Sequence, residues 1–413
     1  MNSVKLLGVI LNIGAAFLRC GAETYRVEDS LYRICAAYGF TESNLWVIPT
    51  NIQATVTDPN GEIITQIRHI RSTGSNFDRL DKLNALSRKI CATTPNADAL
   101  ELMLKDVLEG RVLPSLVSYI ASAFTGTAFA IFFGSDFMDA IVAACASLLI
   151  VFLEHRLNRR ESNPLVYNFI ITAITEIFII LAVNVGIGHH VGYISVGVVM
   201  LLISAMGTTI GISDLAHMHI LSGLLNIIKS LNGAIGIALG VALPLYIFKD
   251  IGSYEIMNTN VSAYVTLISC TIGCFGFAIL YNLRGMKAYV CGLGALLTWV
   301  TYLVCIKLYP VSFVANLLAA ATCGLFAQIM ARVIKTPSSI FTTISVFPVI
   351  PGATLYYTMY GIVTANSELA LSKALSLVLT CTAIVLGFMT VEVIYKHLLK
   401  EIKSFIRNKN RRA

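Results

Sequence analysis

Two charged side chains lie deep inside long apolar runs of the sequence. Glu176 is in the middle of "ITEIF", and Lys229 lies within the apolar segment 216–248. A charge in the hydrocarbon of a bilayer costs several kcal/mol unless it is paired or hydrated, so such residues mark candidate transport sites. In one interpretation Glu176 carries a coupling proton or binds an amine, and Lys229 is its ion-pair partner or the counter-charge for a carboxylate. In the other, the two form a static pair, or Lys229 extends to the membrane interface.

A second polar group follows an apolar segment in "TTIGISDLAHMH". Asp214 could titrate or cap the next helix, and His217 and His219 could relay protons. The alternative is that the two histidines are residues of a surface loop. His189 and His190 lie in another short loop, where we expect them to be solvated. No metal site is expected.

Two apolar segments stop short of a full membrane crossing. The segment 191–206 stops at Gly207, and the run that begins at residue 338 stops at Gly352, each after about 15 residues. At 1.5 Å per residue that is about 22 Å, against about 30 Å of hydrocarbon. Pro351 lacks the N–H that a continuous helix needs. Matching breaks predict a substrate site, with Thr354, Tyr356 and Tyr357 following the second; ordinary kinks or a surface loop are the alternative.

A charged stretch, "CGAETYRVEDSLYRIC", comes long before these segments. Its apolar residues recur at helical spacing, and its charges include Glu23, Arg26, Glu28 and Asp29. The simplest interpretation is a structural helix with one solvated face. The alternative is that these four residues form a gate or a docking surface beneath a transport path.

The composition indicates a membrane protein. Of the 413 residues, 56% are hydrophobic and 13% are charged, and the mean hydropathy is +0.75. We expect a polytopic α-helical membrane protein with an N-terminal cytoplasmic α+β domain. The ten predicted transmembrane segments are 113–133, 137–153, 164–186, 191–206, 216–248, 263–281, 288–306, 312–331, 338–363 and 373–395.

The sequence before the first span predicts an α+β domain. An amphipathic helix comes first, in preference to a signal peptide, and the charged helix follows. Two β-branched runs, "LWVIPTNIQATVT" and "EIITQIRHI", are joined by Asp58-Pro59-Asn60-Gly61, which is a strong hairpin signal. Two further helices are expected in "FDRLDKLNALSRKICATT" and "NADALELMLKDVLEG".

Basic residues orient the chain. The loops on the side of the N-terminal domain carry Arg156, Arg159, Arg160, Arg284, Lys287, Arg332 and Lys335, whereas the opposite loops carry only Lys249 and Lys307. The positive-inside rule therefore places both termini in the cytoplasm. The predicted domains are 1–112, the five-helix halves 113–250 and 251–395, and a basic tail 396–413. Because each half has an odd number of helices, the second half enters the membrane from the opposite side. The halves are therefore predicted to be inverted repeats. The net charge of +7 arises from loops and tail, and needs no nucleic acid.

Sequence patterns of common enzymes are missing. The chain has no P-loop, HExxH, GxSxG or CxxC pattern, so neither ATPase activity nor a cofactor is expected. A membrane-anchored hydrolase, or a sensor, with its activity in residues 1–110 stays open as an alternative.

The motif "CGAETYRVEDSLYRICAAYG" resembles the opening of the bacterial threonine/serine exporter family. "SDLAHMHILSGLLNII" and "PVIPGATLYYTMYGI" are similar to the ends of that family's two membrane halves. The resemblance covers essentially the whole chain, and one departure is Met206-Gly207, where members commonly have Pro-Gly. It implies a multi-pass protein of the bacterial inner membrane that exports threonine and serine with the proton motive force. Split two-chain relatives imply dicarboxylate (succinate) export as the alternative. Substrate and protons are the implied partners, and a homo-oligomer is compatible with the sequence.

From these features we predict a mechanism. The segment after Gly352 would bind the substrate carboxylate at a helix N-terminus, and Glu176 would receive the amine and the proton. Lys229 would suit the second carboxylate of a dicarboxylate.

Overall fold

The computed structural model describes residues 3–71, 73–110, 113–157, 163–248 and 261–410. Three of the basic residues used for orientation, Arg159, Arg160 and Lys249, lie outside these ranges, and the side chains of the tail beyond residue 395 are not described.

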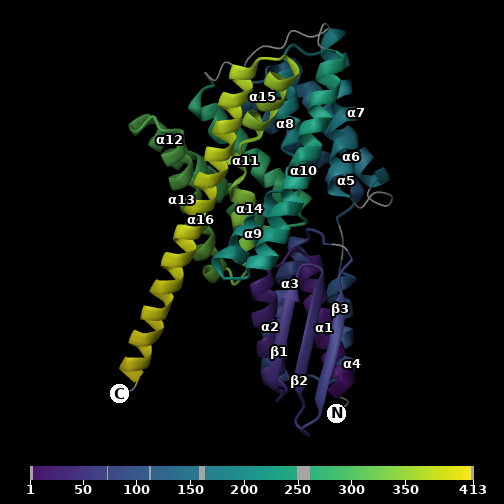
Figure 1. Cartoon of the computed structure of the whole chain (residues 1–413), viewed down its shortest axis with the longest axis vertical. Helices are drawn as coiled ribbons and strands as arrows, with labels where there is room; N and C mark the ends of the chain where they lie inside the picture. The colour runs from purple at the N-terminus through teal and green to yellow at the C-terminus, as the bar shows by residue number, and fades with distance from the viewer. Residues whose placement is uncertain (1–2, 72, 111–112, 158–162, 249–260, 411–413) are drawn as a thin grey trace.

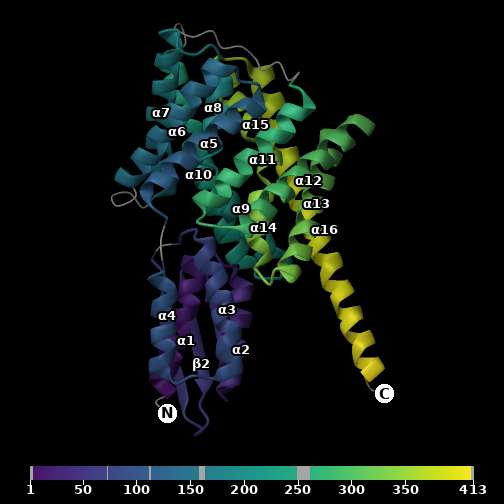
Figure 2. The same cartoon turned by 180° about the vertical axis from the view of Figure 1, so that it is seen from behind.

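Residues 3–108 form a three-stranded antiparallel sheet with four helices, which we call the N-terminal unit. Its sheet has the order β1-β2-β3, and the helices lie on one face of it (Figures 1 and 2). The elements are α1 (Ser3–Arg19), α2 (Thr24–Ala37), β1 (Thr41–Ile48), β2 (Asn51–Thr57), β3 (Ile63–His69), α3 (Phe77–Thr93) and α4 (Ala97–Leu108).

The predicted hairpin between β2 and β3 is present. The amide of Asp58 bonds to the carbonyl of Glu62 at 2.9 Å, and Gly61 has a φ of 89°, which glycine adopts without strain. The first β-branched run was predicted as a single strand, and this is wrong. It turns at Pro49-Thr50, so that Ile48 pairs with Asn51 and the run becomes two strands. Proline favours this turn because its ring fixes φ.

Helix α1 is the core of the N-terminal unit. Its residues from Leu6 to Leu18 are almost all buried, and it packs against α2, α3, α4 and the sheet. One close approach is at Gly14, where an added Cβ would lie 2.9 Å from Leu31 and 3.0 Å from Ile52. The helix is therefore an internal element of a folded unit.

The described residues after position 112 are mainly helical and form two halves. The first half contains α5 (Ser115–Phe133), α6 (Phe137–Leu157), α7 (Pro164–Asn184), α8 (Val191–Val199), α9 (Ala205–Ala216) and α10 (Ile220–Ile247). The second half contains α11 (Ala263–Leu280), α12 (Met286–Leu308), α13 (Ser312–Val333), α14 (Ser338–Ser345), the 3₁₀ turn η1 (Phe347–Val349), α15 (Gly352–Val363) and α16 (Ser367–Asn410).

Eight helices of the described residues are long and apolar enough to cross a membrane: α5, α6, α7, α10, α11, α12, α13 and α16. A ninth candidate is the pair formed by residues 338–349 and α15, which is bent by 47°. The segment predicted as the fourth span, 191–206, is α8 followed by the break at residues 200–204, and α9 begins only at Ala205. Among the described residues, eight of the ten predicted segments therefore correspond to continuous candidate spans, the ninth corresponds to the bent pair, and the fourth does not correspond to a span.

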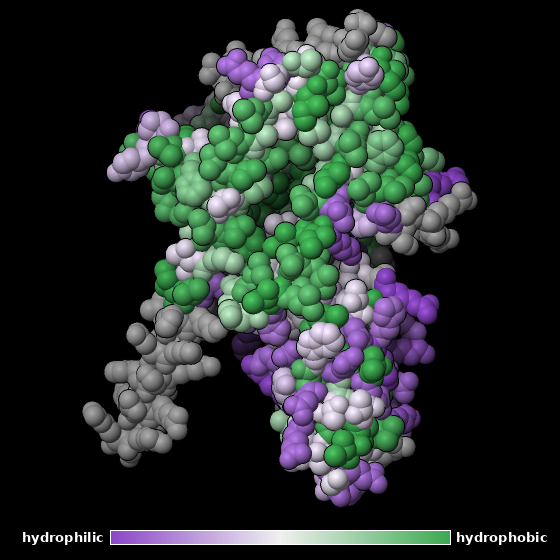
Figure 3. All heavy atoms as spheres, viewed as in Figure 1, coloured by the Kyte–Doolittle hydropathy of each residue, from purple (hydrophilic) through white to green (hydrophobic). Residues whose placement is uncertain are grey.

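The two halves have corresponding packing. In the first half α5 packs on α6, α7 on α10 and α6 on α8; in the second, α11 packs on α12, α13 on α16 and α12 on α14. Across the halves, α5 packs on α11, α10 on α15, and α16 on α9. The helices are apolar on the outside, and hydrophilic residues concentrate on the N-terminal unit (Figure 3). The C-terminal part of α16 projects from the same end of the helices as that unit (Figure 1).

Glycines allow the helices to approach closely, which gives a stability prediction. A Cβ on Gly197 of α8 would lie 2.4 Å from the backbone of Ala130 in α5, whereas one on Gly292 of α12 would have no neighbour nearer than 3.6 Å. Because backbone cannot move aside cheaply, we expect Gly197→Ala to lower the free energy of unfolding by about 1–3 kcal/mol. Thermal unfolding in detergent measures this, with Gly292→Ala as the control; equal midpoints for the two variants would contradict the packing.

Candidate functional site

The two broken segments lie against each other between the halves. A Cβ on Gly352, the first residue of α15, would lie 2.7 Å from the sulfur of Met200 in the first break. Further along, the hydroxyls of Thr209 in α9 and Thr343 in α14 are 2.9 Å apart. The two breaks, where backbone groups lack helical hydrogen bonds, therefore lie close together in the molecule.

The position of the first break differs from the sequence prediction. Helix α8 ends at Val199, so Gly207 lies in the first turn of α9 and not at the end of the span. An added Cβ there would be 2.3 Å from the hydroxyl of Ser230, so the glycine allows α9 to contact α10. The segment after the second break, by contrast, begins as predicted, with Pro351 preceding α15.

A small polar cavity, which we call the inter-half cavity, lies between α9 and the second half. Its volume is about 30 Å³, which suits about one water molecule. Hydroxyls from α9 and α14 and two carboxylates line it, together with a few apolar groups: Thr209, Ile212, Ser213, Gly324, Gln328, Ser338, Ser339, Thr342, Phe388, Val391, Glu392 and Glu23. Ser339 Oγ is buried there and has no hydrogen-bond partner among the described residues. Polar groups of both halves thus line the cavity.

The beginning of α2 closes this cavity from the side of the N-terminal unit. Glu23 is only 1% exposed and lies in the lining. Arg26 bonds to it, with Nε 3.0 Å from Oε2, and also donates from Nη2 to the hydroxyl of Ser338 at 3.0 Å. A buried carboxylate is stable beside such a charge-assisted partner. The charged motif of the sequence therefore contacts α14 directly.

Asp214, in α9 of the first half, contacts the N-terminal end of α2. The amide of Tyr25, in the first turn of α2, donates to Asp214 Oδ1 at 3.4 Å, and Asn226 donates to Oδ2 at 3.4 Å. A carboxylate at a helix N-terminus is favoured by the free amides and the helix dipole. Of the two expected roles, capping applies to a different helix: Asp214 contacts the N-terminus of α2, 189 residues earlier, and not that of the following helix. Its titration stays a prediction.

An aromatic stack and a further carboxylate complete the contact. The rings of Tyr25 and His217 are 3.6 Å apart and nearly parallel. His217 Nδ1 lies 3.6 Å from Glu392 Oε1, and the hydroxyl of Ser213 donates to the same carboxylate at 3.4 Å. His217 is therefore a residue of this interface and not of a free loop. Glu392, at the end of the last predicted span, was not singled out by the sequence.

The other two residues of the motif lie further from the cavity. Asp29 pairs with Arg33 at 2.7 Å on the exposed face of α2. Glu28 is half-buried; burial raises its pKa, and the nearby His219 opposes that rise. Of the four residues predicted as a gate or docking surface, only Glu23 and Arg26 therefore reach the inter-half cavity or its lining.

Glu176 and Lys229 do not meet. Glu176 is buried in α7 and accepts a hydrogen bond from Ser195 of α8 at 2.9 Å, a partner that sequence reasoning missed. Lys229 instead donates to Thr73 of the N-terminal unit at 2.6 Å. Because Gly236 lies against Leu165 and Gly240 against Thr172, α7 and α10 run in the same direction. Glu176 and Lys229 are then about 20 Å apart along that pair, at 1.5 Å per residue.

The residues after the second break are packed inside the first half. Thr354 donates to the carbonyl of Pro351 at 2.8 Å, and Tyr356 and Tyr357 are buried in the core of α7, α8 and α10. Lys373 lies over the ring of Tyr357 at 5.9 Å. These side chains do not line the inter-half cavity.

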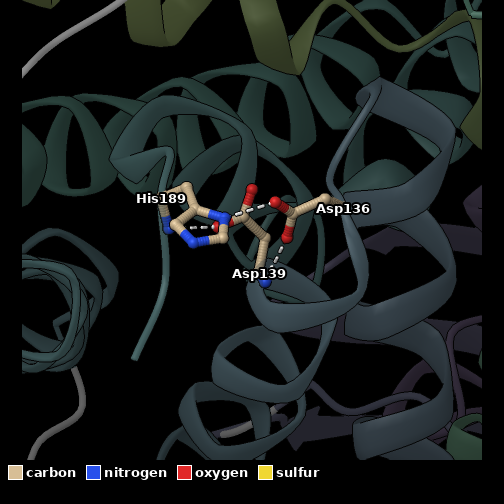
Figure 4. Close-up of side chains that lie close together, drawn as sticks. All are labelled: Asp136, Asp139 and His189. Atoms are coloured by element: carbon tan, nitrogen blue, oxygen red, sulfur yellow. Dashed lines mark hydrogen bonds and ion pairs between the residues drawn. The ribbon is translucent and has the colours of Figure 1, made fainter. Parts of the chain in front are cut away.

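Asp136, Asp139 and His189 come together at the opposite end of the helices (Figure 4). Their ligand atoms lie within 4.8 Å of one another, a spacing that could hold a metal ion. However, buried Asp139 already accepts the backbone amides of His189 and His190 at 2.7 and 3.1 Å. His190 also bonds to Asp139 at 2.8 Å and is partly buried, whereas His189 is exposed, as expected. The hydrogen bond and charge of Asp136 raise the pKa of His189.

Comparison with known families covers most of the chain. A family model described as a threonine/serine exporter matches residues 8–248, and a second, with the same description, matches residues 266–394. No curated protein and no solved structure matches the chain significantly.

Proposed function

The chain belongs to the threonine/serine exporter family, and from that premise we propose that it exports small hydrophilic amino acids, threonine and serine among them, using the proton motive force. Its family is one of membrane exporters, and no enzymatic activity is needed to explain the chain. The proposal places it in the bacterial inner membrane.

The observation that carries the proposal is the chemistry of the inter-half cavity. Glu23 and Glu392 supply carboxylates for a substrate ammonium, and Arg26 is a guanidinium at the cavity's edge for a substrate carboxylate. The hydroxyls of Ser338, Ser339 and Thr342 suit a polar side chain. A zwitterion with a hydroxyl group matches this set, whereas a dicarboxylate would face two carboxylates of like charge.

The packing of the halves supports alternating access. Corresponding pairs of helices are in contact in the two halves, and each half has one broken segment, as in transporters built from inverted repeats. A cavity of about 30 Å³ is too small for an amino acid, so it must widen before a substrate can bind. We propose that rocking of one half against the other widens it, toward the cytoplasm and then toward the outside.

We propose a cytoplasmic location for the N-terminal unit and for the end of α16. Both project from one end of the helices (Figure 1), and Arg156, Lys287 and Arg332 are at helix ends on that side. Basic residues favour the cytoplasmic side of a membrane. In this orientation α2 closes the route by which substrate enters from the cell.

Glu176 is the proposed carrier of the coupling proton. It is buried in α7, and its hydrogen-bond partner among the described residues is the neutral hydroxyl of Ser195. A buried carboxyl group without a neighbouring cation is costly to ionise, so it exchanges protons when water reaches it.

Efflux measurements test the substrate and the energy source. Cells that carry the chain are loaded with a threonine- or serine-containing dipeptide, and external amino acid is followed with and without an uncoupler. We expect efflux that depends on the chain and stops when the proton gradient is collapsed. Succinate efflux in place of threonine efflux would assign the dicarboxylate alternative, and efflux that survives the uncoupler would remove proton coupling.

Glu392→Gln separates substrate binding from coupling. The variant keeps the hydrogen-bonding shape but removes one negative charge from the inter-half cavity. Because a hydrogen bond to a charged group contributes about 1.5–3 kcal/mol, we expect the KM for threonine to rise about tenfold or more. Concentration-dependent efflux measures this, and Glu101→Gln on the exposed face of α4 is the control for expression. An unchanged KM would place the substrate elsewhere.

A further inference from the structure

A second cavity, which we call the junction cavity, lies where the N-terminal unit meets the first half. Its volume is about 260 Å³, enough for a small ligand of several atoms. The unit contributes Leu18, Gly21, Ala22, Thr24, Pro49, Thr73, Gly74 and Ser75, and helices α9 and α10 with the residue before them contribute Ser204, Met206, Gly207, Ile210, Asn226, Lys229 and Ser230. It shares no lining residue with the inter-half cavity.

The junction cavity has a positively charged lining. Its charge comes from the side chain of Lys229, and no aspartate or glutamate is present in the lining formed by the described residues. The Lys229 ammonium donates to the neutral hydroxyl of Thr73 at 2.6 Å and has no carboxylate partner within the described ranges. An ammonium group beside a recess without acidic residues attracts an anion.

Hydrogen-bond donors face the same recess. Helix α9 begins in the lining, and no side chain caps the amides of its first turn, which includes Met206 and Gly207. Such uncapped amides bind anions. The buried hydroxyl of Ser230, which lies beside Gly207, has no hydrogen-bond partner among the described residues. Buried polar groups without partners are rare, so this hydroxyl points to a ligand.

We propose that the junction cavity binds a small oxyanion, a carboxylate or a phosphate, between Lys229 and the first turn of α9. The anion is either a soluble metabolite or the phosphate of a lipid headgroup, and both present the same oxygen atoms to the site. Because the N-terminal unit and the first half both line the cavity, the bound anion stabilises the docked unit. This inference does not depend on what the chain exports.

Binding is tested on the purified full-length chain. In detergent or in phosphatidylcholine nanodiscs, inorganic phosphate or succinate is added at constant ionic strength, and the thermal unfolding midpoint is followed. We expect a saturable rise for a soluble anion. If the anion is a lipid headgroup, the rise occurs in phosphatidylglycerol nanodiscs without any added salt of these acids. No saturable rise in any of the three conditions overturns the proposal.

Variants locate the site. Lys229→Gln is expected to raise the half-saturating concentration about tenfold or more, since a charged hydrogen bond is lost. Lys307→Gln, at the last turn of α12, is the matched control and is expected to bind as the parent does. Thr73→Asp keeps Lys229 paired by placing a carboxylate beside it; we expect a folded protein that no longer responds to the anion. Equal responses from Lys229→Gln, Thr73→Asp and the parent overturn the assignment.

Discussion

Arg26→Gln is expected to release the start of α2 from the helices. The change leaves Glu23 buried, at 1% exposure, without its cationic partner and removes the bond to Ser338. Breaking a buried pair by removing one partner costs about 3–5 kcal/mol. Arg26 keeps some contact with solvent, so we take the lower end of that range. About 3 kcal/mol corresponds to about a hundredfold change in the docking equilibrium.

Hydrogen exchange measures this release. Mass spectrometry of a peptide that covers the first turn of α2 follows the amide of Tyr25, which donates to Asp214. We expect its exchange to be about a hundredfold faster in Arg26→Gln. Arg33→Gln is a matched control on the same helix, because its pair with Asp29 is exposed and contributes about 1 kcal/mol or less. If both variants exchange alike, Arg26 does not hold the unit in place.

Glu176→Gln is expected to uncouple export from the proton gradient. Glutamine preserves the size of the side chain and an acceptor for Ser195, but it cannot take up and release a proton. Moving one charge across 100 mV is worth about 2.3 kcal/mol, which sustains a concentration ratio of about fiftyfold. That contribution to the outward threonine gradient should be lost, while exchange of threonine across the membrane continues.

Reconstituted vesicles test the coupling directly. The steady-state ratio of threonine across the membrane is measured under an imposed proton gradient, together with counterflow in its absence. Ser195→Ala is the control, because it removes the hydrogen bond and keeps the titrating group. A full threonine gradient in Glu176→Gln would exclude this residue as the coupling site.

Local patterns predicted the elements of the fold well. Hydropathy located the long helices, and the Asp58-Pro59-Asn60-Gly61 turn marked the hairpin between β2 and β3. The turn at Pro49-Thr50 was missed because β-branched residues continue on both sides of it. The break at residues 200–204 was placed too late because "MLLIS" is apolar and contains neither glycine nor proline.

Contacts between distant segments could not be read from the sequence. Hydropathy showed that Glu176 and Lys229 lie in apolar segments. It does not show how far apart they are along the helix axes, or on which face of its helix each side chain lies. The cap that Asp214 provides for α2 joins residues 189 positions apart, and the bond from Arg26 to Ser338 joins residues 312 apart. No local propensity reports such pairs, although the charges of the motif suggested a docking surface.

The start of α2 is attached to both halves at once, through Asp214 in α9 and Ser338 in α14. Any movement that separates α9 from α14 must therefore break at least one of these attachments. In a rocking cycle the N-terminal unit would undock and redock once for each substrate molecule. The undocking rate then sets an upper limit on the turnover number. A chain with a more firmly docked unit would therefore export more slowly, even with an unchanged substrate site.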